Sequence, residues 1–157
     1  MSKTMTTRRD FLKTSAQTAG VLGVAGACGS CAWFNKNDVQ VEAPPKASEL
    51  ALSFEKYPKL KEPNGVVLVE ARDGDLRLIL LRVPDGPVVA LSMVCTHWGC
   101  DVDWDTKQAC FDCPCHGSRF DTTGKVLEGP ADEPLPFYPV SETEDGIVVQ
   151  FKPVAKS

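Results

Sequence analysis

Cysteine and histidine are concentrated in one short part of this chain, and this concentration constrains the fold more than any other feature. The chain has seven cysteines and two histidines in 157 residues. Both histidines and five of the cysteines lie between Cys95 and His116. A single cysteine usually serves as a small buried hydrophobic residue, but that role does not explain such a cluster. The pattern therefore predicts a metal site or a disulfide framework in this segment.

Two short segments carry these residues, namely 95–100 (CTHWGC) and 113–118 (CPCHGS). A structural zinc site with two cysteines and two histidines usually takes a Cys pair and a His pair, each with its own spacing. Here each segment offers one cysteine and one histidine very close together. This arrangement suits two irons side by side, with each segment giving one ligand to each iron, as in a Rieske centre.

The two segments resemble the C-x-H-x-G-C and C-P-C-H-G-S boxes of the Rieske proteins of cytochrome bc-type complexes. The resemblance implies a [2Fe–2S] cluster as cofactor. It implies that Cys95 and Cys113 bind one iron, and that His97 and His116 bind the other. A zinc-stabilised binding module is the alternative from another class, and a protein that contains zinc without iron would support it.

The same resemblance assigns roles to residues around the ligands. Cys100 and Cys115 match a pair that forms a disulfide in bc-type proteins and that ferredoxin-like Rieske proteins of oxygenases lack. Ser118 matches a serine whose hydroxyl bonds a bridging sulfide and so belongs to the cofactor-binding residues. Phe120 stands where high-potential members have tyrosine, which predicts a moderate potential. Cys110 has no matching role, and we expect it to be a buried thiol.

Two further features adjoin the boxes. Residues 129–134 (GPADEP) resemble the proline loop that covers the cluster in the family, although Asp132 stands where proline is usual. Trp98 stands where leucine is common, at the tip that docks on the quinone site. A packed core tryptophan is an equally valid interpretation of Trp98.

The N-terminal segment 1–34 has the pattern of a twin-arginine export signal. Residues 7–13 (TRRDFLK) carry the paired arginines, and residues 14–34 follow with no charged side chain. An uncleaved helical membrane anchor is the first expectation, because 21 residues are enough for one span. Lipid attachment at Cys28 is the second, and cleavage after Ala27 with release into the periplasm is the third.

The rest of the chain is predicted to be an all-β Rieske domain. Residues 35–64 are assigned to a proline-interrupted linker, part of which can pack on the domain as an N-terminal strand. Residues 65–152 alternate short apolar runs with turn signals such as Asp85-Gly86 and Asp145-Gly146, which predicts a small antiparallel sandwich or barrel. Residues 153–157 are assigned to a tail. The expected strands are 65–70, 76–83, 88–94, 124–127, 137–141 and 146–151.

The overall charge disfavours a nucleic-acid partner. The formal net charge is −4, and no basic stripe offsets it. The resemblance implies one-electron transfer, by the iron–sulfur subunit of a quinol:cytochrome c oxidoreductase rather than by a complete enzyme. The partners implied are quinol, a cytochrome b-type membrane subunit and a c-type cytochrome acceptor, on the periplasmic side of the bacterial cytoplasmic membrane. The alternatives are the small Rieske subunit of a periplasmic molybdenum oxidase, such as arsenite oxidase, and a stand-alone exported electron carrier.

Overall fold

The structure is a computed structural model that describes residues 39–43, 47–72, 74 and 76–154. Within these ranges the chain forms β-strands and one short 3₁₀ helix, η1 (Pro58–Lys61). The all-β prediction is therefore confirmed. In the described part, no helix is long and apolar enough to cross a membrane. The predicted signal or anchor, residues 1–34, lies outside the described residues.

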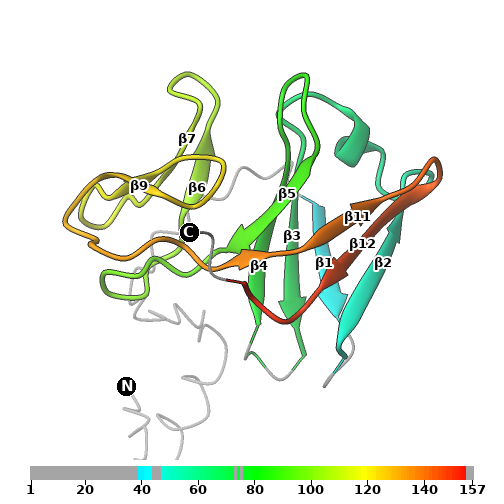
Figure 1. Ribbon diagram of the computed structural model, residues 1–157, viewed down its shortest axis with the longest axis horizontal. Coiled ribbons are helices and arrows are strands. Elements are labelled where there is room, and N and C mark those ends of the chain that lie inside the picture. The colour runs from blue at the N-terminus through cyan, green and yellow to red at the C-terminus, as the bar shows by residue number, and fades with distance from the viewer. Residues whose placement is uncertain (1–38, 44–46, 73, 75, 155–157) are drawn as a thin grey trace, which may run out of the picture. The chain divides into compact units, whose positions relative to one another are not determined.

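The first sheet runs through the middle of the domain (Figure 1). Its strands, in spatial order, are β1 (Val39–Ala43), β3 (Val66–Ala71), β4 (Arg77–Arg82), β5 (Val88–Ser92) and β10 (Phe137–Tyr138). The turn at Asp85-Gly86 joins β4 and β5 in the antiparallel hairpin that the sequence predicts. The pairing of β1 with β3 is parallel, and it is the exception in this sheet.

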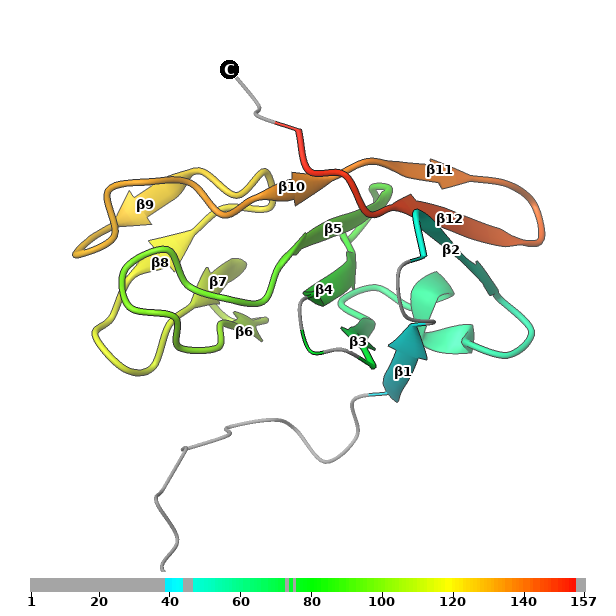
Figure 2. The same cartoon turned by 90° about the horizontal axis from the view of Figure 1, so that it is seen from below.

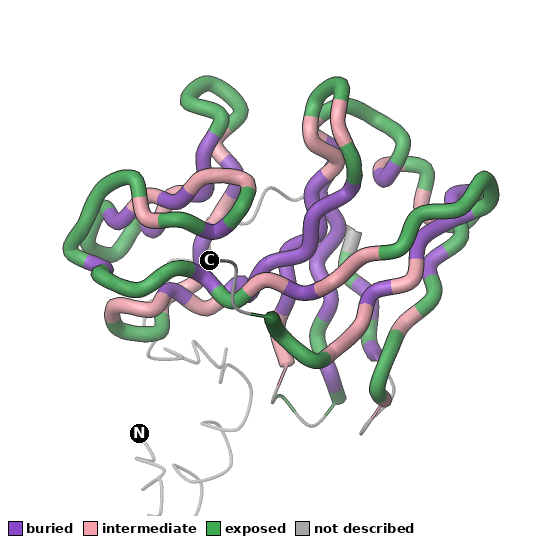
Figure 3. Tube along the Cα trace, in the orientation of Figure 1, coloured by how far each residue is buried: buried purple, intermediate pink, exposed green. Residues whose placement is uncertain are grey.

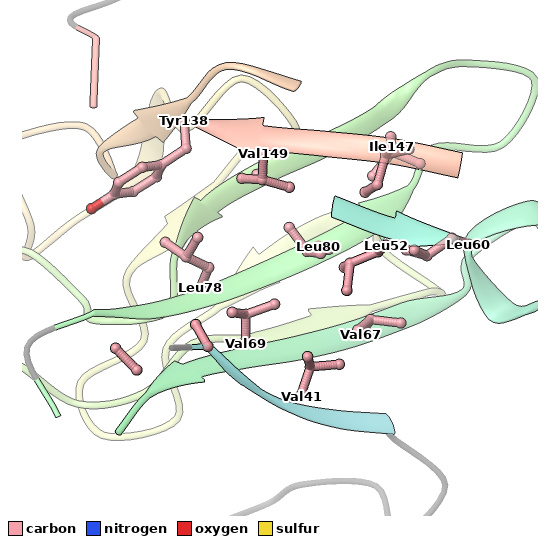
Figure 4. Packing of buried hydrophobic residues seen from close by; sticks show 14 of the residues in the cluster. Val41, Leu52, Leu60, Val67, Val69, Leu78, Leu80, Tyr138, Ile147 and Val149 are labelled. Atoms are coloured by element: carbon pink, nitrogen blue, oxygen red, sulfur yellow. The ribbon is translucent and has the colours of Figure 1, made fainter. Parts of the chain in front are cut away.

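The second sheet consists of β11 (Val140–Glu142), β12 (Gly146–Gln150) and β2 (Glu49–Ser53), and its pairings are antiparallel. Strands β1 and β2 and helix η1 all lie within the segment 35–64, which the sequence analysis assigns to a linker. Apolar side chains of β2 explain its position. Leu52 is buried and packs in the core together with Ile147 and Val149 of β12 (Figure 4).

Both faces of the first sheet are covered, which explains why its strands read as continuous apolar runs. Side chains of one face, such as Val67, Leu78 and Leu80, form a core with the second sheet (Figure 4). Side chains of the other face, such as Leu68 and Ile79, form a second core with the cysteine-rich segment. Figure 3 shows the central strands mostly buried and the hairpin turns exposed. The sheet is therefore a platform for that segment.

The third sheet forms a small subdomain beside this platform (Figure 2). Its strands are β6 (Asp103–Asp105), β7 (Cys110–Asp112), β8 (Arg119–Phe120) and β9 (Val126–Glu128), all paired antiparallel. Three connections carry the residues of interest. Loop 1 (95–100) leads from β5 to β6, loop 2 (113–118) from β7 to β8, and loop 3 (129–134) from β9 to β10.

Candidate metal centre

Loop 1 is a tight turn closed by two backbone hydrogen bonds. The amide of Cys95 donates to the carbonyl of Cys100 at 2.8 Å, and the amide of Gly99 donates to the carbonyl of Cys95 at 3.0 Å. Gly99 has a φ of 76°, a left-handed conformation that glycine adopts without steric cost. These bonds hold residues 95–100 in one compact turn.

Loop 2 repeats this hydrogen-bond pattern. The amide of Cys113 donates to the carbonyl of Ser118 at 2.8 Å, and the amide of Gly117 donates to the carbonyl of Cys113 at 2.9 Å. Gly117 has a φ of 78°, like its counterpart in loop 1. When the two loops are aligned by these hydrogen bonds, His116 occupies the position of Trp98 and not that of His97. The two loops thus share one backbone design with different side chains placed on it.

The first cysteine of each loop is buried and faces the other. Cys95 is 2% exposed and Cys113 is 1% exposed. Burial raises the pKa of the Cys113 thiol, and its hydrogen bond to Cys95 raises the pKa further. The backbone amides of Cys115 and His116 donate to the Cys113 sulfur and act in the opposite direction. The two sulfurs are therefore in contact in a buried position, and a metal bound by both of them would displace their protons.

The two histidines form a second pair. The ring centroids of His97 and His116 are 4.8 Å apart, and the ring planes are nearly perpendicular. The Nδ1 atom of His97 is buried and has no hydrogen-bond partner in the described structure. An unpaired buried nitrogen of this kind is costly, and coordination to a metal removes that cost. The orphaned Nδ1 is therefore the atom of His97 that we expect to face iron.

The donor set fits a cluster with two kinds of ligand. The described residues contain no group of three or more His, Cys, Asp or Glu side chains that could hold one metal ion. The contacts are instead between cysteine and cysteine and between histidine and histidine. Rieske [2Fe–2S] centres have two cysteines on one iron and two histidines on the other, and the residues present match that requirement.

The disulfide between Cys100 and Cys115 is present, with a Cα–Cα distance of 6.4 Å. It connects the end of loop 1 to the middle of loop 2, so the two loops are held in register by a covalent bond. This is the pairing that the resemblance implies. The remaining cysteine of the subdomain, Cys110, is a buried free thiol, as expected, and burial raises its pKa.

Loop 3 is hydrogen-bonded to both other loops. The amide of Ala131 donates to Ser118 Oγ at 3.0 Å, and both residues are buried. Thr96 Oγ1 donates to the carbonyl of Glu133 at 2.7 Å. These contacts attach loop 3 to loops 1 and 2, next to the residues that the resemblance assigns to the cluster. The roles of Thr96 and Glu133 had no sequence signal, because the two residues are far apart in the chain.

Trp98 lies at the surface and stacks on a candidate ligand. Its side chain is 77% exposed. Its ring is nearly parallel to that of His97, with centroids 5.2 Å apart, and meets His116 edge-on at 5.3 Å. Of the two interpretations of Trp98, the exposed tip residue is thus confirmed. Phe120, by contrast, is fully buried in the core under loop 2.

One ion pair between the platform and the subdomain was missed by the sequence analysis. Arg77 of β4 donates to Asp101, the residue that follows loop 1, and both side chains are 28% exposed. Trp104 of β6 also donates its indole N–H to Asn64 Oδ1 at 3.0 Å. Only the tertiary fold brings these residues together.

Comparison with known proteins identifies related sequences. The model of the Rieske [2Fe-2S] domain family matches residues 54–139. Cytochrome b6-f complex iron-sulfur subunit 2 of the Cyanophora paradoxa cyanelle is 37% identical over 114 residues, which cover 71% of this chain and 46% of that protein. The cytochrome b6-f complex iron-sulfur subunit of Synechococcus sp. (strain JA-2-3B'a(2-13)) is 43% identical over 90 residues, which cover 55% and 49%. The chain thus spans about half the length of the curated relatives it matches.

Solved structures share the fold. The cyanobacterial plasma membrane Rieske protein PetC3 from Synechocystis PCC 6803 is 31% identical with a TM-score of 0.53, covering 64% of this chain and 98% of that one. The ferredoxin of carbazole 1,9a-dioxygenase from Nocardioides aromaticivorans IC177 is 24% identical with a TM-score of 0.53, covering 68% and 100%. The second comparison establishes a similar fold only.

Proposed function

Because the chain belongs to the Rieske [2Fe-2S] domain family, we propose that it transfers single electrons as the iron–sulfur subunit of a bc-type quinol:cytochrome c oxidoreductase. The proposed ligands are Cys95 and Cys113 on one iron and His97 and His116 on the other. The single observation that carries the ligand assignment is the buried, unpartnered Nδ1 of His97 beside the ring of His116. A histidine with no metal role would be expected to have a hydrogen-bond partner at that atom.

The bound cluster supplies one-electron redox chemistry at a potential above that of four-cysteine ferredoxins, in the range of roughly −150 to +300 mV. The protein contributes the environment that selects a value within this range. The amides of Cys115 and His116 stabilise negative charge on the Cys113 sulfur. Ser118 accepts the Ala131 amide through its oxygen, which leaves its own hydroxyl hydrogen available to a bridging sulfide. Phe120 offers no hydroxyl, which favours a moderate potential.

The disulfide supports the bc-type branch over the ferredoxin branch of the family. The resemblance links the Cys100–Cys115 bridge to bc-type proteins, and the structure contains it. Relatives at about 40% identity are named as iron–sulfur subunits of cytochrome b6-f complexes. We infer the same class of partners for this chain: quinol and a cytochrome b-type membrane subunit on the donor side, and a c-type cytochrome as acceptor.

We place the protein on the periplasmic side of the cytoplasmic membrane. The twin arginines at positions 8 and 9 support export of a folded protein, and the uncharged segment 14–34 supports attachment to the membrane. A disulfide also persists better outside the cytoplasm. Fractionation of cells, with and without detergent, tests this assignment. Recovery of the protein in the soluble cytoplasmic fraction would contradict it.

The central test combines metal analysis with electron paramagnetic resonance. We expect two irons and two acid-labile sulfides per chain, and a rhombic Rieske spectrum after reduction with dithionite. His97→Ala should abolish this signal, while Cys110→Ala, which alters a cysteine of the same subdomain without a ligand role, should retain it. Zinc in place of iron would refute the proposal. Purification in detergent should co-isolate a b-type cytochrome, and a molybdenum subunit in its place would favour the oxidase alternative.

A further inference from the structure

The exposed tip of the candidate metal centre combines one large aromatic side chain with negative charge. Loops 1, 2 and 3 contain two acidic side chains, Asp132 and Glu133, and they contain no lysine or arginine. Both acidic residues are exposed. The hydrogen bond from Thr96 Oγ1 to the carbonyl of Glu133 holds the backbone of this acidic pair beside loop 1, in which His97 follows Thr96. The exposed Trp98 stacks on the same histidine.

Among the described residues, no cation neutralises these two carboxylates. Elsewhere on the subdomain, Asp112 and Glu128 are both bound by Arg119. Within the described part of the chain, by contrast, the side chains of Asp132 and Glu133 have no ion-pair or hydrogen-bond partner. Both exposed carboxylates can therefore contact another molecule.

The surroundings of the tip strengthen the same negative field. Residues 94–136, which include the three loops and the third sheet, carry eight acidic and three basic side chains. A pocket of about 330 Å³ beside Pro114 of loop 2 is lined by Asp103, Asp105 and Asp112, with Lys107 as the single cation of its lining. Charge of one sign gathered around a site attracts partners of the opposite sign over distances comparable to the Debye length.

We propose that Trp98, Asp132 and Glu133 form a docking surface for a soluble c-type cytochrome whose exposed haem edge is surrounded by lysines. The carboxylates attract and orient the cationic rim, and the indole provides apolar contact at the centre. In the encounter the reduced protein loses one electron, and one ferric haem becomes ferrous; no bond is formed and no proton moves. This inference rests on the proposed electron-transfer function and specifies the acceptor side of it.

The test measures electron transfer from the full-length protein, purified in detergent and reduced beforehand, to a cationic cytochrome c in a stopped-flow instrument. Asp132→Asn/Glu133→Gln removes the two charges without changing the size of the side chains. Glu55→Gln/Glu144→Gln is the matched control. Glu55 follows β2, and Glu144 lies in the turn between β11 and β12, at the end of the domain away from β6, β7 and β9 (Figure 1). An anionic c-type cytochrome serves as the second acceptor.

For the unsubstituted protein, we expect the second-order rate constant with the cationic acceptor to fall at least about tenfold between about 0.01 M and 1 M salt, where the Debye length shrinks from about 30 to 3 Å. The Asp132/Glu133 variant should react about three- to tenfold more slowly at low salt and within about twofold of the parent at high salt. The control variant should stay within about twofold throughout, and the anionic acceptor should react faster as salt rises.

Equal rates for the tip variant and the control variant would overturn the docking proposal. So would a rate for the unsubstituted protein that does not depend on salt, and this second measurement needs no variant. Trp98 is left unchanged because it touches a candidate ligand. Failure of the proposed function looks different: the unsubstituted protein would then lack the Rieske spectrum and would not reduce either acceptor.

Discussion

Ser118→Ala tests whether the Ser118 hydroxyl group both accepts a hydrogen bond from loop 3 and donates one to the candidate cluster. Ser118 is fully buried, and its Oγ accepts the amide of Ala131 at 3.0 Å. A serine hydroxyl can accept one bond and donate another at the same time. The amide therefore polarises the hydroxyl, and the hydroxyl hydrogen is free to point at a bridging sulfide. Alanine removes both interactions and adds no bulk.

Two magnitudes follow from this arrangement. Ala131 is itself buried, so its amide would lose its partner away from water, and the free energy of unfolding should fall by about 1–3 kcal/mol. A hydrogen bond to a charged group contributes roughly 1.5–3 kcal/mol. We assume that this contribution is gained when the cluster is reduced. For a one-electron couple, roughly 1.4 kcal/mol corresponds to about 59 mV, so the Ser118→Ala variant should have a potential lower by roughly 60–130 mV.

The assay pairs a redox titration followed by visible circular dichroism with thermal unfolding of the same sample. Ser92→Ala is the control, because Ser92 is also a buried serine whose Oγ accepts a backbone amide, that of Val94, at 3.1 Å. We expect the control to lose stability and to keep its potential. A Ser118→Ala protein with an unchanged potential would refute the proposed hydrogen bond to the cluster.

Three further changes have defined outcomes. Replacing both Cys100 and Cys115 by serine removes a disulfide with a sequence separation of 15. The free energy of unfolding should fall by about 3 kcal/mol, and cluster absorbance should be lost faster on heating. The control Cys110→Ala should not change the rate of that loss. Phe120→Tyr should raise the potential by about 60 mV, if its hydroxyl donates one bond of roughly 1.4 kcal/mol to a ligand sulfur. Asp103→Asn should raise the melting temperature at pH 7, because burial raises the pKa of Asp103.

The sign of the last effect sets the pH window. A carboxyl group with a raised pKa stabilises the folded state fully below its unfolded pKa of about 3.9, and this contribution is lost as the pH rises through the folded pKa. The advantage of asparagine should therefore vanish below about pH 3.9. An equal advantage at all pH values would show that burial of charge is not the cause. For the other two changes, unaltered cluster lifetime or an unmoved potential would contradict the reasoning.

The strand pattern was largely predictable, and its exceptions have clear physical causes. Hairpin β4–β5 was marked by apolar runs on either side of Asp85-Gly86. Strand β1 carried little local signal, since its place is set by parallel pairing with β3, a partner distant in sequence. Strand β2, which the sequence predicted only as a possible strand somewhere within residues 35–64, is held by pairing with β12 near the other end of the chain.

The sequence by itself determined the chemistry of the candidate site. The types and spacing of Cys95, His97, Cys113 and His116 indicate a cluster with mixed ligands, because those spacings are local and need no tertiary contact to be recognised. Likewise the twin-arginine motif is a linear pattern. Such features follow directly from the order of residues.

Only the tertiary structure decided how that site is presented. Ser118 meets Ala131 across 13 positions and Thr96 meets Glu133 across 37, so neither contact could be read from local spacing. The exposure of Trp98 was likewise undecided, since an aromatic side chain next to a ligand can face the core or the solvent. Packing of loop 3 against loops 1 and 2 fixed these contacts, and it brought the backbone of the acidic pair in loop 3 beside loop 1, which carries the exposed indole.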